Sequence, residues 1–371
     1  MTALREEVLN YVRDEGERWA ELIERERRVP DELWAQLRDR GYLRLAAPRE
    51  FGGQGIPLTR YLELLELFSR SHASLRMIVH VCNGIWRPLD SHATQEQRER
   101  FVLPQIAGEI KVAFTLTEPT AGTGADLRAS VVREGEIYYL SGEKHLITFG
   151  TIADYLLCFA RVAGTRGAAG TVALMVPPRG DGVQANVMPE TMGVRGTDHA
   201  HLVFDRAPVP VVNRLGQEGE GLSIALSGFL APSRISVAMT CVGLAARALE
   251  LALAYAQQRE TFGRKIAQRQ AIAFRLAEMA TEIEAARSLA LHAAAMWERE
   301  GGAIAESSMA KLFATEMLQR VTDSALQVHG GVGYWSSSPI ERVYRDARAQ
   351  RFEEGTAEIQ KTTIARELLR R

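Results

Sequence analysis

Cysteine is scarce in this chain. Only Cys82, Cys158 and Cys241 occur among 371 residues, far apart and without a C-x-x-C pair. This spacing argues against a disulfide framework and against a thiolate zinc site, so we expect no bound metal. An excess of one charge sign is also missing, because 45 basic and 46 acidic residues give a net charge of −1. No bulk field therefore indicates nucleic acid or anionic lipid as a partner.

Long apolar segments are missing as well. The first residues carry charges throughout and lack the apolar stretch of a signal peptide. No uninterrupted apolar run approaches the roughly 18 residues that a membrane-spanning helix needs. Hydrophobic residues at 46% and charged residues at 25% are ordinary values for a globular protein. We therefore expect a cytoplasmic, multidomain protein that binds neither membrane nor nucleic acid.

The chain divides into three blocks of different texture. Residues 1–111 have helical patterns, interrupted by glycines and prolines at 47–57. Residues 112–216 contain short segments rich in β-branched and aromatic residues, separated by Gly, Pro and Asp turns. Residues 217–371 return to long Ala- and Leu-rich runs with charges at helical intervals. This order predicts a mainly α protein with a helical domain, a central β domain and a helical bundle.

Four segments have residues suited to binding a polar heterocycle or a phosphate. They offer closely spaced hydroxyls, an arginine beside an aromatic ring, or glycines that let a ligand approach the backbone. Each of them alone is equally well explained as a turn, a strand or a helix cap. The segments are FTLTEPTAGTG (114–124), GEKHLITFG (142–150), RETFGR (259–264) with Gln270, and QVHGGVGY (327–334).

A fifth segment, FEEGT (352–356), has two carboxylates just before a glycine turn. A carboxylate held at the start of a turn is suited to act as a general base. The segment contains two glutamates, Glu353 and Glu354, where such chemistry needs one.

In this order and spacing the five segments resemble the acyl-CoA dehydrogenase family, and the resemblance covers nearly the whole chain. MGVRGTDHAHLVFDRAPVP (192–210) also resembles that family's exit from its β domain. The resemblance implies an N-terminal α domain (1–111), a middle β-barrel-like domain (112–216) and a C-terminal four-helix bundle (217–371). It further implies one FAD per subunit, a dimer of dimers, and an electron-transferring flavoprotein as the acceptor. The implied reaction is α,β-dehydrogenation of an acyl-CoA thioester, with α-proton abstraction by a base and β-hydride transfer to flavin N5.

The resemblance also implies roles for single residues. Glu354 takes the position of the catalytic base. The implied substrate contacts are Thr123, Arg234, Glu353 and Arg76. The implied FAD contacts are Leu116, Thr117, Thr123, Thr148, Arg259, Phe262, Gln270, Gln327, Gly330, Gly331, Thr356 and Glu358, and those from Arg259 to Gly331 would reach the partner subunit's cofactor.

Several departures from the family pattern bear on the substrate. Some relatives place the base on the first bundle helix, but Phe229–Arg234 contains no carboxylate here, which favours Glu354. Glu353 replaces a common Tyr facing the acyl pocket; it is either a solvated or salt-bridged glutamate or a contact for a polar acyl group. Arg76 lies in an apolar helical run, where it reaches solvent, pairs with an acid, or binds a substrate carboxylate. Leu146 replaces the usual Trp beside the flavin.

A non-catalytic binding or scaffold protein of this fold is disfavoured by the presence of Glu354, Thr148 and Arg259, and two further alternatives remain open besides acyl-CoA dehydrogenation. The first is dehydrogenation of an acyl group on a carrier protein in secondary metabolism. The second is a flavin oxidase or monooxygenase of the same fold, which the less shielded flavin wall at Leu146 favours. His80 and Cys82, on the same helix as Arg76, are interpreted as packing residues rather than a nucleophilic pair.

Overall fold

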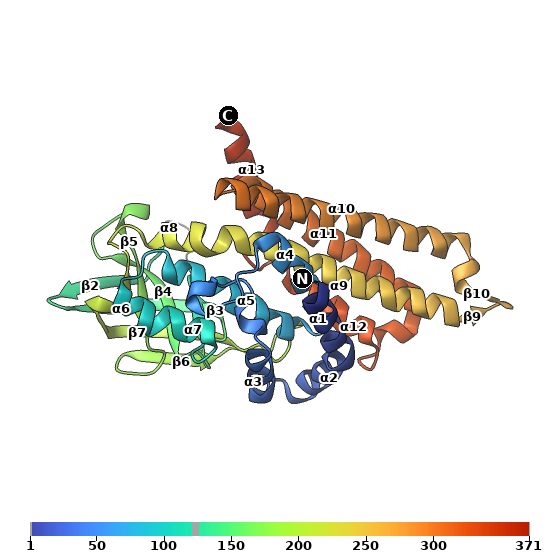
Figure 1. The fold of residues 1–371 in the computed structure, drawn as a ribbon, viewed down its shortest axis with the longest axis horizontal. Coiled ribbons are helices and arrows are strands. Elements are labelled where there is room, and N and C mark those ends of the chain that lie inside the picture. Colours follow the sequence, from blue (N-terminus) through green and yellow to red (C-terminus); the bar gives the residue numbers. More distant parts are fainter. Residues whose placement is uncertain (1, 121–125, 371) are drawn as a thin grey trace.

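The computed structural model describes residues 2–120 and 126–370. The chain begins with helices, continues through a sheet, and ends in long helices (Figure 1). The N-terminal elements are α1 (Thr2–Asp14), α2 (Gly16–Glu26), α3 (Asp31–Asp39), η1 (Tyr42–Arg44), η2 (Arg49–Phe51), α4 (Leu58–Phe68), α5 (Ala73–Asp90), α6 (Gln95–Gln97), η3 (Arg98–Val102) and α7 (Leu103–Ala107).

Helix α5 is the N-terminal element that matters most for the site. It begins at His72, whose ring Nδ1 accepts a hydrogen bond from the Ser74 amide at 3.0 Å, which satisfies one of the free donors of the first turn. Residues four, four and three apart share one face of a helix. Arg76, His80, Gly84 and Arg87 therefore follow one another along the face that meets the C-terminal helices.

The middle of the chain forms one eight-stranded sheet. Its strands are β1 (Val112–Thr115), β2 (Ser130–Glu134), β3 (Ile137–Thr148), β4 (Tyr155–Val162), β5 (Thr171–Val176), β6 (Val183–Val187), β7 (His199–Pro210) and β8 (Arg214–Leu215). The short helices η4 (Ala168–Gly170) and η5 (Val211–Asn213) lie between strands. The order is β6-β7-β3-β2-β4-β5-β8, and β1 pairs with β4 in parallel. A register shift between Lys144 and Ile147 leaves Leu146 with a φ of 57° at a bulge in β3.

The C-terminal part consists of long helices around an alanine-rich core. Its elements are α8 (Gly221–Ser223), η6 (Ile224–Leu230), α9 (Ala231–Gln258), β9 (Glu260–Thr261), β10 (Arg264–Lys265), η7 (Ile266–Gln268), α10 (Gln270–Glu300), α11 (Ile304–His329), η8 (Gly330–Tyr334), α12 (Pro339–Ala349) and α13 (Ala357–Leu369). Gly243 lets α9 approach α4 closely, because a Cβ there would lie 2.3 Å from the Glu66 carbonyl oxygen. Taken by length and composition alone, the continuous stretch Gly221–Gln258 is able to cross a membrane, but 67% of its most apolar window is buried, as in the core helix of a globular protein.

One buried carboxylate joins the three parts of the molecule. Asp346 of α12 accepts hydrogen bonds from the Ala73 amide at 3.2 Å and from the Val194 amide at 2.6 Å. It thereby ties the C-terminal helices to the start of α5 and to the segment before β7. The sheet lies at one end of the molecule and the β9–β10 hairpin at the other (Figure 1). The predicted fold class is confirmed, whereas the boundaries at 111/112 and 216/217 stay predictions.

Candidate active site

The candidate base Glu354 lies in the turn between α12 and α13. Its φ of 54° is left-handed, and Gly355 follows with a φ of 97°. A left-handed non-glycine residue costs on the order of 1–3 kcal/mol and persists only where its surroundings hold it. The strained backbone of this turn therefore serves to place the Glu354 side chain.

Three buried side chains hold the turn through its carbonyl oxygens. Gln360 Nε2 and Arg234 Nε donate to the Glu354 carbonyl at 3.0 and 3.3 Å. Lys311 Nζ donates to the Gly355 carbonyl at 2.6 Å and to the Arg351 carbonyl at 3.1 Å. Arg234, expected near the substrate, thus positions the base residue through its backbone.

The Glu354 carboxylate is oriented by a chain of two further side chains. Ser233 Oγ donates to Glu354 Oε1 at 2.7 Å, and His80 Nε2 lies 2.9 Å from the same hydroxyl oxygen. His80 comes from α5 and Ser233 from the first turn of α9, directly after the π-helical segment η6. Such π-helical segments often mark functional sites. The interpretation of His80 as a packing residue is incomplete, because its ring belongs to this chain of hydrogen bonds.

The environment of Glu354 suits proton transfer near neutral pH. Burial raises the pKa of Glu354 to about 7; the Ser233 hydrogen bond opposes the rise, and the neighbouring Glu353 charge adds to it. Burial, with the charges of Arg76 and Arg87, lowers the pKa of His80 to about 3, so the imidazole is neutral. A carboxylic acid with a pKa near the working pH is an effective general base.

The second glutamate of the pair has a different partner. Arg76 binds Glu353 through two hydrogen bonds of 3.1 Å each, and Arg76 Nη2 also donates to Gln350 Oε1 at 3.0 Å. The Arg76 side chain is fully buried, whereas 18% of the Glu353 side chain is exposed. Burial alone would raise the pKa of Glu353, but the charge and hydrogen bonds of Arg76 hold it below its ordinary value. Of the alternatives open for these residues, the structure shows the ion pair, and each group already has its counter-ion.

The loop expected at the flavin's pyrimidine edge is anchored by a buried ion pair. Lys144 Nζ binds Glu118 Oε1 at 2.8 Å and the Leu116 carbonyl at 2.9 Å. The Thr117 carbonyl accepts from the His145 amide at 3.0 Å. The two segments that sequence reasoning chose separately are therefore held side by side. Thr123 lies outside the described residues.

Thr148 ends β3 opposite His199 of β7 and is partly exposed. Leu146, two residues earlier, is 53% exposed at its bulge. The side of the predicted flavin site at Leu146, where less shielding was expected, is thus open at this face of the sheet. This observation leaves the alternative of oxygen chemistry untested.

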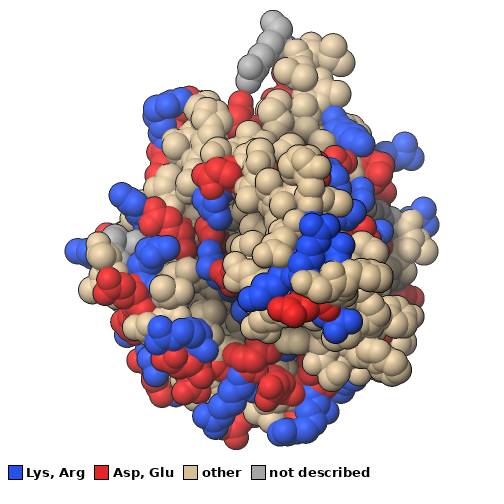
Figure 2. All heavy atoms as spheres, turned by 90° about the vertical axis from the view of Figure 1, so that its right-hand side faces the viewer, with Lys and Arg blue, Asp and Glu red and all other residues tan. Residues whose placement is uncertain are grey.

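The residues expected to reach a partner subunit lie at the opposite end of the molecule from the sheet. Phe262, in the β9–β10 hairpin, is 98% exposed, and Arg259 and Gln270 flank the hairpin on the surface. Figure 2 faces this end, where uncharged areas lie between groups of both charge signs. Exposed apolar side chains on the neighbouring helices α10 and η8, and directly after η8, are Phe274, Val332, Tyr334 and Trp335. Within one chain these residues do not meet Glu354.

The remaining cofactor candidates are exposed, except Thr356, which is partly buried. Gln327, Gly330 and Gly331 end helix α11 at the surface, and a Cβ added at either glycine would meet no atom within 4 Å. Thr356 begins α13, and its side chain makes no capping hydrogen bond to the helix. The amides of this helix start offer donors that suit a phosphate, whereas Glu358 in its first turn is a carboxylate that accepts hydrogen bonds, as from a hydroxyl group. These donors fit a flavin dinucleotide.

Sequence reasoning missed the residues that position the site. His80, Ser233, Lys311 and Gln360 are all needed to hold Glu354, and Lys144 holds the Leu116 loop. For His80, Lys144 and Lys311 the available signal was a polar side chain in a largely apolar helix or strand, which is ambiguous without the neighbouring element.

The sequence of this chain resembles those of known proteins over nearly its whole length. The sequence matches the acyl-CoA dehydrogenase N-terminal domain over residues 1–109, the middle domain over residues 113–207 and the C-terminal domain over residues 219–369. It is 36% identical over 368 residues to an acyl-CoA dehydrogenase of Bacillus subtilis, covering 99% of this chain and 97% of that protein. The chain belongs to the acyl-CoA dehydrogenase family.

Two further similarities show how widely the family's fold is used. The chain is 34% identical over 367 residues to a subunit of the caffeyl-CoA reductase-Etf complex of Acetobacterium woodii, covering 98% of this chain and 94% of that protein. The crystal structure of acyl-CoA dehydrogenase from Geobacillus kaustophilus superposes with a TM-score of 0.94 at 30% identity, covering 99% of this chain and 97% of that one. Membership of this family makes the protein a flavoprotein oxidoreductase, as predicted.

Proposed function

We propose that this acyl-CoA dehydrogenase family member catalyses FAD-dependent α,β-dehydrogenation of an acyl-CoA thioester, with Glu354 as the base. The observation that carries the proposal is the Glu354 carboxylate, held by Ser233 at 2.7 Å on a clamped left-handed turn. Its raised pKa suits removal of a weakly acidic α-proton. FAD, when bound, supplies the acceptor for the β-hydride.

The chain's own residues account for the proton side of the reaction. Glu354 Oε1 is fixed by the Ser233 hydroxyl, which leaves Oε2 as the oxygen free to take the proton. Ionised Glu354 is stabilised by that hydrogen bond and by the charges of Arg234 and Lys311. Arg259, Phe262 and Gln270 would hold the cofactor of a second copy, and the exposed apolar side chains around their hairpin support a homo-oligomer, for which we propose a dimer of dimers.

The electron acceptor and the location of the protein are parts of the same proposal. An electron-transferring flavoprotein is supported by the relative named as a subunit of a reductase-Etf complex. A cytoplasmic location, and the lack of nucleic-acid and membrane partners, stay predictions from composition and charge.

Anaerobic mixing of the yellow, FAD-loaded protein with a panel of acyl thioesters tests the proposal. Bleaching of the flavin by acyl-CoA supports it. Bleaching only by acyl groups on a carrier protein would favour the alternative substrate, and peroxide release in air would favour an oxidase. A loaded protein that no thioester bleaches would refute the proposed function.

The pH dependence of bleaching follows from the pKa of Glu354. The base must be ionised, so the rate at low substrate concentration is expected to rise about tenfold per pH unit below pH 7 and to level off above it. Stopped-flow measurements between pH 5.5 and 9 check this. A profile that is flat through pH 7 would contradict the assignment of the base.

Ser233→Ala removes a hydrogen bond that lowers the pKa of Glu354. The midpoint of the pH profile is therefore expected to move upward, with a smaller loss of rate at high pH than at neutral pH. Ser227→Ala is the matched control, since its exposed hydroxyl donates only to the Ser223 carbonyl at 2.6 Å. A downward shift of the midpoint in Ser233→Ala would show that Ser233 does not stabilise the carboxylate.

A further inference from the structure

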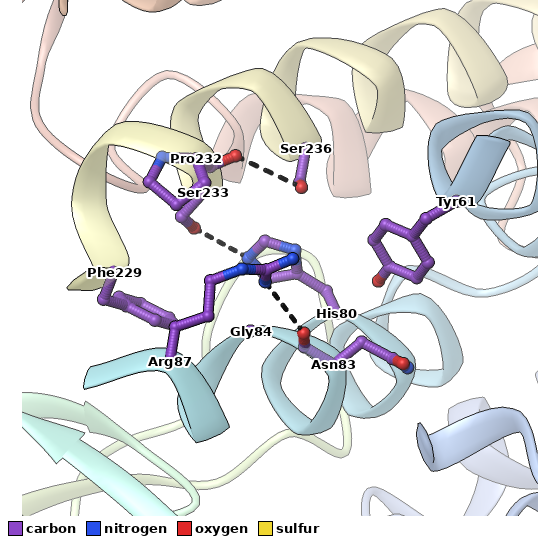
Figure 3. A pocket seen from close by; sticks show the side chains of 9 residues that line it. All are labelled: Tyr61, His80, Asn83, Gly84, Arg87, Phe229, Pro232, Ser233 and Ser236. Atoms are coloured by element: carbon purple, nitrogen blue, oxygen red, sulfur yellow. Dashed lines mark hydrogen bonds between the residues drawn. The ribbon is translucent and has the colours of Figure 1, made fainter. Parts of the chain in front are cut away.

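A small cavity lies between α4, α5 and the start of α9, directly beside the hydroxyl that holds the base (Figure 3). His80, Gly84 and Arg87 line it from α5, and Phe229, Ser233 and Ser236 line it from η6 and α9. At Gly84 a Cβ would lie 3.1 Å from the Phe229 ring, so the glycine keeps this space open. The cavity has a volume of about 10 Å³, which is room for a single water-sized group such as a hydroxyl.

Most polar side chains of the lining already have partners. Asn83 donates to the Tyr42 and Val79 carbonyls, both at 2.8 Å, and accepts from the Ala46 amide at 2.9 Å. Ser236 Oγ donates to the Pro232 carbonyl at 3.3 Å. His80 is the exception: its side chain is 4% exposed, and its Nδ1 has no hydrogen-bond partner among the described residues. A buried polar atom without a partner is costly, and His80 lines the cavity, so a group bound there can satisfy Nδ1.

The direction of the hydrogen bonds defines what Nδ1 requires. Ser233 has one hydroxyl proton and donates it to the Glu354 carboxylate. Its oxygen therefore accepts from His80, so the proton of the neutral imidazole is on Nε2. Nδ1 consequently carries a lone pair and is an acceptor. It requires a donor such as a hydroxyl group, whereas a carboxylate would place a second lone pair against it.

Arg87 provides the complementary donor. Its guanidinium donates to the Asn83 carbonyl at 3.1 Å and lies 4.8 Å from the Trp86 ring centre. In the described part of the chain no carboxylate forms a salt bridge with it, and its remaining N–H groups can donate to a hydroxyl oxygen. A hydroxyl group can donate a hydrogen bond to His80 Nδ1 and accept one from Arg87.

We propose that this cavity binds a hydroxyl group on the acyl chain, so that the protein acts on hydroxyacyl thioesters in preference to unsubstituted ones. The inference rests on the proposed function and names its substrate class. The hydroxyl is not consumed: Glu354 takes the α-proton, FAD when bound would supply the acceptor for the β-hydride, and the hydroxyl stays on C4 or beyond. The Ser233 hydroxyl and the His80 ring lie between the Glu354 carboxylate and Nδ1. A short acyl chain can span this separation.

The test compares two substrates of nearly equal shape, 4-hydroxybutyryl-CoA and pentanoyl-CoA, in anaerobic flavin bleaching. With the wild-type protein, kcat/KM is expected to be about tenfold higher for the hydroxyl compound, the value of one good hydrogen bond. Equal or lower values for 4-hydroxybutyryl-CoA would overturn the inference while leaving the proposed function intact. Bleaching by neither compound nor by any other thioester would instead refute the function. A preference for succinyl-CoA would also overturn the inference, because Arg87 would then be binding a carboxylate.

The role of His80 is tested by His80→Leu, which removes the acceptor. The preference for the hydroxyl compound is expected to disappear, and KM is expected to rise by a larger factor than kcat falls. Cys82→Ala, a neighbour on the same helix that does not line the cavity, is the control and is expected to keep the preference. If His80→Leu does not fold, His80→Asn offers an amide oxygen as acceptor and is expected to retain part of the preference. A full preference in a folded His80→Leu protein would contradict the assignment.

Discussion

Glu354→Gln is expected to slow anaerobic flavin bleaching by an acyl thioester by about 10²- to 10⁴-fold, the usual contribution of a general base. The amide keeps the shape of the side chain and still accepts from Ser233, but it cannot take the α-proton. FAD content, far-UV circular dichroism and the visible flavin spectrum are expected to stay as in the wild type. Stopped-flow bleaching at pH 8, above the pKa of the base, measures the loss without the influence of protonation.

Glu353→Gln is the matched comparison for this prediction. It leaves the base in place but removes the neighbouring negative charge, which raises the pKa of Glu354, and weakens the bonds of residue 353 to Arg76 and Gln350. Bleaching is expected to remain within about tenfold of the wild type, because Glu353 makes no proton transfer. If Glu354→Gln kept near-normal bleaching and Glu353→Gln lost it, the roles of the two glutamates would have to be exchanged.

Arg76→Ala is expected to lower the stability of the folded protein by about 3–5 kcal/mol. The substitution leaves Glu353 as an uncompensated carboxylate, with only Gln350 Nε2 donating to it at 3.1 Å, and opens a void in the core. The Arg76 side chain is fully buried, so water cannot replace it without rearrangement. Thermal unfolding followed by circular dichroism, at fixed FAD concentration, measures the change.

The double variant Arg76→Met with Glu353→Leu separates ion-pair loss from loss of volume. Replacing both members of a buried pair by apolar groups is often nearly neutral, so this protein is expected to be more stable than Arg76→Ala. The same proteins report on the acyl pocket: a changed order of substrate preference would show that the ion pair forms part of its wall. An Arg76→Ala protein as stable as the wild type would contradict the structural role of the pair.

The architecture and the base were within reach of the sequence because their signals are local. The change from helical to strand texture near residue 112 and back near 217 follows from side-chain periodicity, which each segment carries by itself. The FEEGT segment marks a pair of carboxylates before a glycine turn, and the resemblance to the family's C-terminal signature singles out Glu354 from that pair. Phe262 and the glycines 330 and 331 are recognisable because surface hairpins and helix ends have their own residue preferences.

The partners of those residues required the tertiary structure. Arg76 and Glu353 are 277 positions apart, and His80 and Ser233 are 153 apart, so no local pattern relates them. Their meeting depends on how α5 crosses α9 and on where the α12–α13 turn is clamped by Lys311 and Gln360. A single buried charge in a sequence is equally consistent with solvent, an ion pair or a substrate.

By itself, therefore, the sequence determined the order of the domains and the resemblance to the family, because these rest on residue types at short spacing, and that resemblance indicated which of two adjacent glutamates is the candidate base. Only the tertiary structure decided that Glu353 is bound by Arg76 and that His80 presents a lone pair to a cavity beside the base. The physical reason is that burial and hydrogen-bond direction arise only when distant segments pack together.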